Sequence, residues 1–182
     1  DWRRPYTYLK KNEIVTSSIR REVLNTRNNV GIFDASTLGK ILVKGADAAK
    51  FLDLMYTNMI STMKVGSCRY SLMCNENGFL FDDGVVVRLT EDTFLCHTTS
   101  GGADRVYSWM EEWLQTEWWN KRVFILNQTE QFSQIAVAGP NSRKLLQKLT
   151  QTDLSASSLP FMSFCDCNFG NIPARVFRIS FS

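Results

Sequence analysis

The chain has 182 residues, of which 44% are hydrophobic and 21% are charged, and its net charge is +3. This is the composition of an ordinary globular protein, and it excludes disordered and collagen-like chains. No apolar run reaches the roughly 18 residues that a transmembrane helix requires, and the first residues lack the apolar centre of a signal peptide. We therefore expect no membrane contact, and one domain or one domain with part of another.

The charge is distributed unevenly along the chain. Residues 1–30 carry a net charge of +4, and the remaining residues carry −1. Such a basic arm could contact nucleic acid or an acidic protein surface, or its charges could simply be solvated. No RNA-binding, zinc-finger or helix-turn-helix motif accompanies the arm, so we do not expect a nucleic-acid partner.

Five cysteines, an odd number at irregular spacing, argue against a disulfide framework and favour a reducing cytoplasm. Cys165 and Cys167 form the one close pair, but their spacing is short for zinc, and His97 is the single histidine. We expect no metal site, and we expect the cysteines to be small apolar core residues.

The first half of the chain predicts a helix, a strand and a second helix. Residues 19–28 have a weak helical pattern, and 39–45 (GKILVKG) read as a short strand closed by Gly45. The following segment, 46–56, places Phe51, Leu52 and Met55 on one face of a helix.

A three-stranded meander is expected next. Strand-like runs at 69–74 and 79–89 are joined by a turn that ends in Asn77-Gly78, the strongest short-range hairpin signal, because both residues tolerate positive φ. After a polar turn, 93–98 supplies the third strand.

The clearest helix of the sequence follows Gly101-Gly102. Its apolar stripe consists of Val106, Trp109, Met110, Trp113 and Leu114. Trp118 and Trp119 at its end are expected to seal the helix against the sheet.

The remaining chain alternates strands and helices. We expect strands at 123–126 and 134–137, a helix that starts at Gly139-Pro140, and a final strand at 174–181. The predicted class is α+β with mostly antiparallel sheets. We treat residues 1–182 as one domain with a possible subdomain break near 128–133, and since the sequence stops at a strand, we expect the fold to continue beyond it.

The sequence around Asp82-Asp83 is unusual because two carboxylates interrupt an apolar strand. Adjacent strand residues point to opposite faces, so the two cannot act as a close pair, and one of them should face the apolar side. A buried carboxylate requires a partner, a raised pKa or a ligand. The alternative is a bulge at Gly84 that turns both groups to water.

Three segments, FDASTLGKILVKGADAAKFLD, RYSLMCNENGFLFDDGVVVRL and AVAGPNSRKLL, resemble the folate-binding aminomethyltransferase family, which includes the glycine cleavage T-protein. The opening WRRPYTY, together with HTTSGGADRV and MEEWLQTEW, is similar to a subgroup, the carboxy-terminal domain of the alpha subunit of heterotetrameric sarcosine oxidase. T-proteins typically carry His-Met where this chain has Thr37-Leu38.

The resemblance implies three subdomains arranged around a channel that holds tetrahydrofolate. It implies that Asp83 orients the folate and assists nitrogen attack on a one-carbon iminium or formaldehyde, with Asp82 also at the folate site. Tyr70, Met73, Thr98 and Thr99 match positions near the pterin or benzoyl ring. For Tyr70 and Met73 ordinary core packing is an equal alternative.

The implied activity is capture of the one-carbon unit as 5,10-methylenetetrahydrofolate during oxidative demethylation of sarcosine to glycine. FAD, FMN and NAD are expected only in other domains or subunits, and the other sarcosine oxidase subunits are the expected partners. The family's Gly-Glu motif would follow Ser182, so this chain is expected to carry part of the site and to be inactive alone. Two alternatives remain open: another aminomethyltransferase or demethylase of the family, and a non-catalytic scaffold for subunit contacts.

Overall fold

The computed structural model describes residues 5–180, in which helices pack against three antiparallel sheets. The strands are β1 (Gly31–Asp34), β2 (Gly39–Lys44), β3 (Cys68–Cys74), β4 (Leu80–Arg88), β5 (Thr93–Thr98), β6 (Phe124–Asn127), β7 (Ile135–Ala138), β8 (Ser163–Phe169) and β9 (Ile172–Arg178). The α-helices are α1 (Val15–Asn28), α2 (Ala48–Met55), α3 (Ala103–Thr116) and α4 (Ser142–Gln147), with short 3-10 turns at Ile60–Thr62, Ser100–Gly102 and Thr129–Gln131. The predicted α+β class is confirmed.

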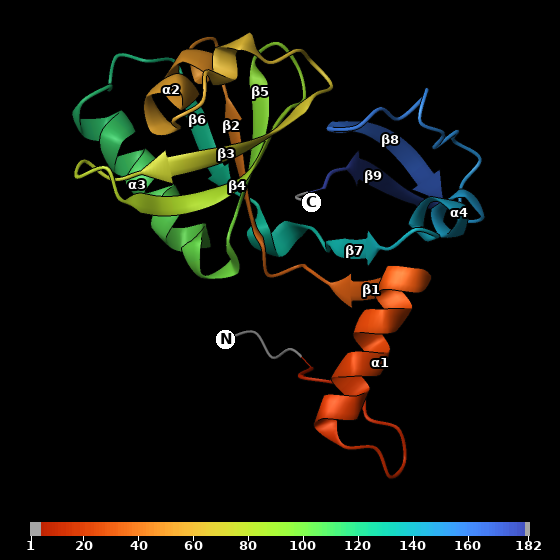
Figure 1. Ribbon diagram of the computed structural model, residues 1–182. Helices are drawn as coiled ribbons and strands as arrows, with labels where there is room; N and C mark the ends of the chain where they lie inside the picture. Colours follow the sequence, from red (N-terminus) through yellow and green to blue (C-terminus); the bar gives the residue numbers. More distant parts are fainter. Residues whose placement is uncertain (1–4, 181–182) are drawn as a thin grey trace.

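The five-stranded sheet has the order β3-β4-β5-β2-β6, and the remaining strands form the pairs β1-β7 and β8-β9 (Figure 1). The predicted meander is therefore correct. Every pairing in these sheets is antiparallel. Short connections require this for β3-β4, β4-β5 and β8-β9.

Helix α1 begins four residues before the predicted start, at Val15. The apolar pattern of this helix is weak, and polar contacts hold its first turns in place instead. Thr7 Oγ1 donates to the hydroxyl of buried Ser18 at 2.7 Å, and Arg21 pairs with Glu13 at 2.8 Å. These bonds hold the segment before the helix against its first turns. Of the basic arm, Arg3 and Arg4, and with them most of the WRRP motif, lie outside the described residues.

One face of the five-stranded sheet packs against α2 and α3. The predicted apolar residues of α2, Phe51, Leu52 and Met55, are buried there, and Val106 and Met110 of α3 are fully buried. Trp118 packs on the edge of Phe51, with ring centroids 5.9 Å apart, whereas Trp119 is 75% exposed. The prediction that both tryptophans seal the helix is therefore wrong for Trp119, which follows the turn that carries the chain away from α3.

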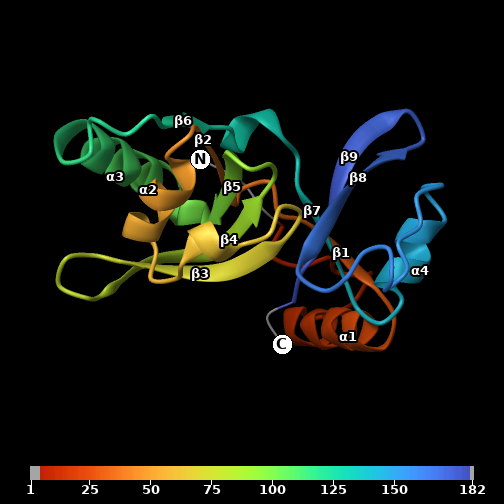
Figure 2. The ribbon, with the colours of Figure 1, turned by 90° about the horizontal axis from the view of Figure 1, so that it is seen from above.

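The other face of this sheet contacts the β8-β9 hairpin. Val85 and Val87 form a small cluster with Phe164 and Phe177, and the amide of Cys68 donates to the Met162 carbonyl at 2.7 Å. Figure 2 shows the hairpin to one side of the five-stranded sheet. The two faces of the sheet therefore have different neighbours, helices on one and strands on the other.

The chain crosses twice between the β1-β7 pair and the five-stranded sheet. Residues 35–38 lead from β1 into β2, and residues 128–134 lead from β6 back to β7 beside β1 (Figure 1). We call α1, β1, β7, α4, β8 and β9 together the second lobe. The predicted boundary near 128–133 falls on the return crossing and stays a prediction.

The five cysteines are free, and Cys68, Cys96 and Cys167 are buried as predicted. Cys74 and Cys165 are only half-buried, so the prediction of core positions is wrong for these two. Among residues 5–180, none of the helices has the length and apolar character to cross a membrane. Within the same residues, side chains of His, Cys, Asp and Glu do not gather into a group that could hold a metal ion.

Candidate functional site at the β3-β4 hairpin

The turn between β3 and β4 is organised by Asn75 and Gly78. The Asn75 side-chain oxygen accepts hydrogen bonds from the amides of Asn77 (3.1 Å) and Phe79 (3.0 Å), and the Gly78 amide donates to the Asn75 carbonyl at 2.9 Å. Of the four turn residues, only Gly78 has a positive φ, 78°. The hairpin prediction is confirmed, but Asn77 does not adopt the left-handed conformation that a two-residue Asn-Gly turn would need.

A β-bulge lies at Phe81, three residues before the predicted position. Met73 is paired with Asp82 and Cys74 with Leu80, so that Phe81 has no partner in the register. Its ring stacks on Trp109 of α3 at 4.9 Å and lies under the Arg105 guanidinium at 4.4 Å. The bulge at Gly84 was therefore a wrong prediction. Gly84 is needed for another reason, because a Cβ there would collide with the His97 carbonyl.

Asp82 and Asp83 face opposite sides of the sheet, as the strand period predicts. Asp82 is the buried one, at 6% exposure, and it points toward the start of α3. Its carboxylate accepts hydrogen bonds from the Thr99 hydroxyl at 2.6 Å and the Thr99 amide at 3.1 Å. The strand pattern left open which carboxylate is buried and whether its partner is a protein group or a ligand. The buried carboxylate is Asp82, and its partner is Thr99 of the protein itself.

Asp83 lies on the face turned toward the β8-β9 hairpin and is half-buried. Tyr70 of β3, 41% exposed, donates its hydroxyl to Asp83 Oδ2 at 2.7 Å. This hydrogen bond to the carboxylate is the main cause of the raised pKa of Tyr70, because ionising the phenol would remove the donor. Leu72, paired with Asp83, is 37% exposed beside it. The result is a carboxylate oriented by a phenol next to accessible apolar surface.

Met73 and Thr98 lie on the helix-covered face, away from Asp83. Met73 is 1% exposed within the main hydrophobic core, so the packing alternative holds for this residue. Thr98 is 3% exposed and donates its hydroxyl to the Thr99 carbonyl at 2.9 Å. The six predicted site residues therefore divide into two groups: Tyr70 with Asp83 on one face, and Asp82, Thr99, Thr98 and Met73 on the other.

Lys40 is buried and His97 is half-buried, and the sequence analysis missed the surroundings of both. They are paired across β5 and β2, and Lys40 is 3% exposed. His97 Nδ1 lies 3.1 Å from the Val85 carbonyl, and its ring meets the edge of Phe177 of β9. Burial lowers the His97 pKa from 6.5 to about 4, so the imidazole is neutral at physiological pH. The alternation of β2 and β5 could have placed both residues on one face, although not the contacts of Lys40 with residues 35–38 and 128–134 or of His97 with Phe177.

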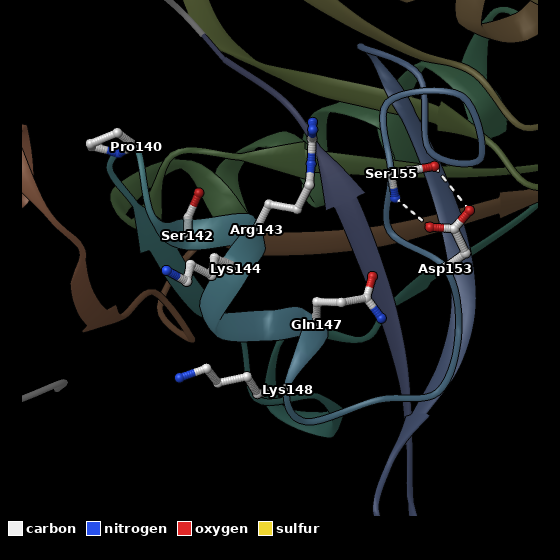
Figure 3. Close-up of a pocket in the computed structure, with 8 residues that line it drawn as sticks. All are labelled: Pro140, Ser142, Arg143, Lys144, Gln147, Lys148, Asp153 and Ser155. Carbon is white, nitrogen blue, oxygen red and sulfur yellow. Dashed lines mark hydrogen bonds between the residues drawn. The ribbon is translucent and has the colours of Figure 1, made fainter.

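A separate open groove lies on the second lobe beside α4 (Figure 3). It is lined by Pro140, Ser142, Arg143, Lys144, Gln147, Lys148, Asp153 and Ser155. Asp153 is occupied by hydrogen bonds from Ser155 and Ser158. None of the residues predicted from the sequence to form the site lines this groove, so the Tyr70–Asp83 pair is the better candidate.

Comparison with known proteins places the whole chain in one family. Residues 1–182 match the GCVT N-terminal domain. The chain is 49% identical, over its full length, to the sarcosine oxidase subunit alpha of Corynebacterium sp. (strain U-96), and spans 19% of that protein. It is 34% identical to the aminomethyltransferase of Thermosipho melanesiensis, over 91% of this chain and 44% of that one. The resemblance inferred from sequence motifs is thereby confirmed.

Two solved structures share the fold. Aminomethyltransferase T of the glycine cleavage system from Bartonella henselae superposes with a TM-score of 0.68 at 25% identity, over 81% of this chain and 38% of that one. The heterotetrameric sarcosine oxidase of Corynebacterium sp. U-96, in complex with pyrrole 2-carboxylate, gives a TM-score of 0.58 at 15% identity, over 88% of this chain and 76% of that one. The second likeness concerns the fold alone.

Proposed function

Because the chain belongs to the GCVT N-terminal domain family, we propose that it binds a reduced folate and acts as the one-carbon acceptor domain of a sarcosine oxidase. In that assembly sarcosine is oxidatively demethylated to glycine, and the one-carbon unit leaves as 5,10-methylenetetrahydrofolate. The chain spans about a fifth of the length of the sarcosine oxidase alpha subunits that it matches. In this proposal the flavins and NAD bind to other domains or subunits of the complex. We also propose that the complex is cytoplasmic.

The observation that carries this proposal is the hydrogen bond from Tyr70 to Asp83. It fixes one carboxylate oxygen, Oδ2, on a face of the sheet where Tyr70 and Leu72 are both accessible. A flat heteroaromatic ring with N–H donors suits such a surface, because the phenol and leucine offer apolar contact and the carboxylate offers acceptors. The residues present therefore fit a pterin.

Asp83 has three roles in this account. A bound reduced folate supplies the nitrogens that take up the one-carbon unit. Asp83 would accept a hydrogen bond from the ring system and so orient it, and its negative charge would stabilise the positive charge that develops as the new carbon–nitrogen bond forms. It would also be the carboxylate that receives the proton released by the attacking nitrogen.

Tyr70 keeps Asp83 in the required rotamer. The phenol donates to Oδ2, and Oδ1 would then be the oxygen that accepts from a bound folate. Asp82 has a different task on the opposite face, where it joins β4 to the start of α3 through Thr99. The two aspartates therefore have separate roles, Asp83 in ligand binding and Asp82 in holding β4 to the start of α3.

The main alternative is transfer of an aminomethyl group, as the name of the Thermosipho relative indicates for that protein. The 49% identity to the sarcosine oxidase subunit, against 34% to the aminomethyltransferase, favours the first reading. A scaffold role is the other alternative, and the exposed Trp119 and Phe124 are the surface it would use.

The test uses the natural polypeptide that contains this chain, assembled with its partners and supplied with sarcosine and tetrahydrofolate. We expect the parent to yield 5,10-methylenetetrahydrofolate, and Asp83→Ala to oxidise sarcosine at the same rate while releasing free formaldehyde. Glu76→Ala removes an exposed carboxylate from the same hairpin and serves as the control. Unchanged capture in Asp83→Ala would remove the proposed role of this residue. Lack of capture in the parent would favour the scaffold.

A further inference from the structure

Lys40 is a lysine whose charged group lies inside the protein. It is located in β2 and is 3% exposed. Its ammonium donates to three main-chain oxygens, those of Ser36 (3.0 Å), Leu38 (2.9 Å) and Thr129 (3.4 Å). These acceptors are neutral, while Asp34 and Glu130 favour the positive charge from a greater distance.

The three acceptors belong to the two segments that connect the five-stranded sheet with the second lobe. Ser36 and Leu38 are in the 35–38 crossing, and Thr129 is in the 128–134 crossing. The Lys40 main chain adds two more bonds to the return crossing: its amide donates to Thr129 Oγ1 at 3.1 Å, and its carbonyl accepts from the Gln128 amide at 2.7 Å. One residue therefore binds both crossings.

A second contact holds the crossings together nearer to β1 and β7. The Ala35 amide donates to the Gln134 carbonyl at 2.8 Å, and the Gln134 amide donates to the Ser36 hydroxyl at 2.9 Å. Ala35 and Ser36 are buried. The two crossings therefore run side by side and form a short neck of two segments. Lys40 lies at the end of this neck that joins the five-stranded sheet.

Burying an ammonium group is costly unless it is paired or hydrogen-bonded. The hydrogen bonds of Lys40 are therefore the reason that a lysine is tolerated at this buried position. Burial lowers the pKa of Lys40, which agrees with a removed water shell. Three charge-assisted bonds offset that cost. A methionine would fill a similar volume but would leave three carbonyls, those of buried Ser36 and Thr129 and of half-buried Leu38, without their donor.

We infer that Lys40 is a positioning residue, which locks the two crossings together and thereby fixes the second lobe relative to the sheet that carries Asp83. Phe177 of the second lobe contacts His97, which is paired with Lys40. Asp83 is on the face of β4 where Val85 and Val87 pack against Phe164 and Phe177 of the β8-β9 hairpin. A change in the orientation of that hairpin would therefore alter the surroundings of Asp83. The effect on ligand binding rests on the proposed function, whereas the effect on lobe orientation does not.

The experiment compares Lys40→Met with Lys44→Met in the natural polypeptide. Lys44 is in the same strand and on the same face but is exposed, so it is a matched control. Hydrogen exchange is followed in peptides from 35–38, 128–134 and β3–β5. The distance between the lobes is measured by electron spin resonance between labels at Glu76 and Asn171, two exposed positions. Introducing both labels as unnatural amino acids leaves the five cysteines unmodified.

In Lys40→Met we expect exchange in both crossings to become at least about tenfold faster, as loss of even one charge-assisted hydrogen bond implies. Exchange in β3–β5 should not change, and the distance distribution should broaden. The affinity for 5-formyltetrahydrofolate should fall about tenfold or more. Lys44→Met should match the parent in each readout.

Unchanged exchange and an unchanged distance distribution in Lys40→Met would overturn the inference. So would faster exchange throughout the chain, which indicates general destabilisation. If Lys40→Met does not fold, Lys40→Gln keeps one donor group and is judged by the same criteria. A parent that binds no folate would refute the proposed function, while exchange and distance would still decide the role of Lys40.

Discussion

Tyr70 and Asp83 come from neighbouring strands, and the Tyr70 hydroxyl donates to Asp83 Oδ2 at 2.7 Å. Their main chains are not directly paired, since Tyr70 is opposite Val85 and Asp83 is opposite Leu72. The contact is thus a diagonal one, within reach of a long aromatic side chain. It depends on the register of β3 and β4, which the bulge at Phe81 resets next to Asp82.

Substitution of Tyr70 tests whether this contact matters for the ligand. We expect Tyr70→Phe to keep the fold and to weaken binding of a reduced folate, because the hydrogen bond that orients Asp83 is lost. The Asp83 carboxylate would remain but would lose its orientation. Isothermal titration calorimetry measures the change, and equal affinities of Tyr70→Phe and the parent would contradict it.

The Asp82–Thr99 contact is predicted to stabilise the fold rather than to bind the ligand. Removal of the carboxylate in Asp82→Ala leaves the Thr99 amide and hydroxyl without their acceptor, so we expect a loss of about 1–3 kcal/mol in unfolding free energy. A double-mutant cycle with Thr99→Ala in urea unfolding should give a positive coupling energy. Strictly additive effects would mean that the two residues act independently.

We predict that position 102 requires glycine, because Asp82 and Thr99 leave no room for a side chain there. A Cβ there would lie 2.6 Å from Asp82 Oδ1 and 2.7 Å from Thr99 Oγ1. We expect Gly102→Ala to lose about 1–3 kcal/mol of stability by displacing this contact. The adjacent Gly101→Ala is the control, because a Cβ at Gly101 meets nothing within 4 Å. Similar unfolding free energies for both variants would contradict the geometry.

His97 should make stability depend on pH in a defined window. Its pKa falls from 6.5 to about 4 because burial disfavours the imidazolium. The unfolded state therefore binds the proton first, and stability that is complete above pH 6.5 is lost as the pH falls toward 4. The loss should reach up to about 3 kcal/mol.

The His97 prediction is checked by urea unfolding between these pH values, with His97→Gln expected to flatten the dependence. Since His97 is the only histidine of the chain, NMR can follow its imidazole directly. An imidazole that titrates near 6.5 would show that the group is hydrated.

Local patterns were sufficient to predict most elements. The meander, the α3 stripe and the opposite faces of Asp82 and Asp83 all depend on periods of two or 3.6 residues and on turn residues, which neighbouring positions determine. The start of α1 was missed because it depends on polar contacts between Ser18 and residues before the helix. The spacing of apolar residues in the sequence does not reveal such polar contacts.

The site was only partly predictable for the same reason. Strand period separates Asp82 from Asp83, but which of them is buried depends on the packing of Thr99 and Gly102 at the start of α3. The bulge at Phe81 depends on Trp109 and Arg105, which lie on that helix. The burial of Lys40 depends on a crossing that returns about 90 residues later in the chain, at Thr129. Each is a tertiary contact.

Calorimetric titration of 5-formyltetrahydrofolate into the natural polypeptide, the parent against Asp83→Ala, shows whether Asp83 contacts the folate. We expect saturable binding by the parent and a loss of about 1–3 kcal/mol in the variant, the cost of a hydrogen bond to a charged group. Equal binding by both proteins would show that Asp83 does not contact the folate, and a folded parent that binds none would refute the folate site.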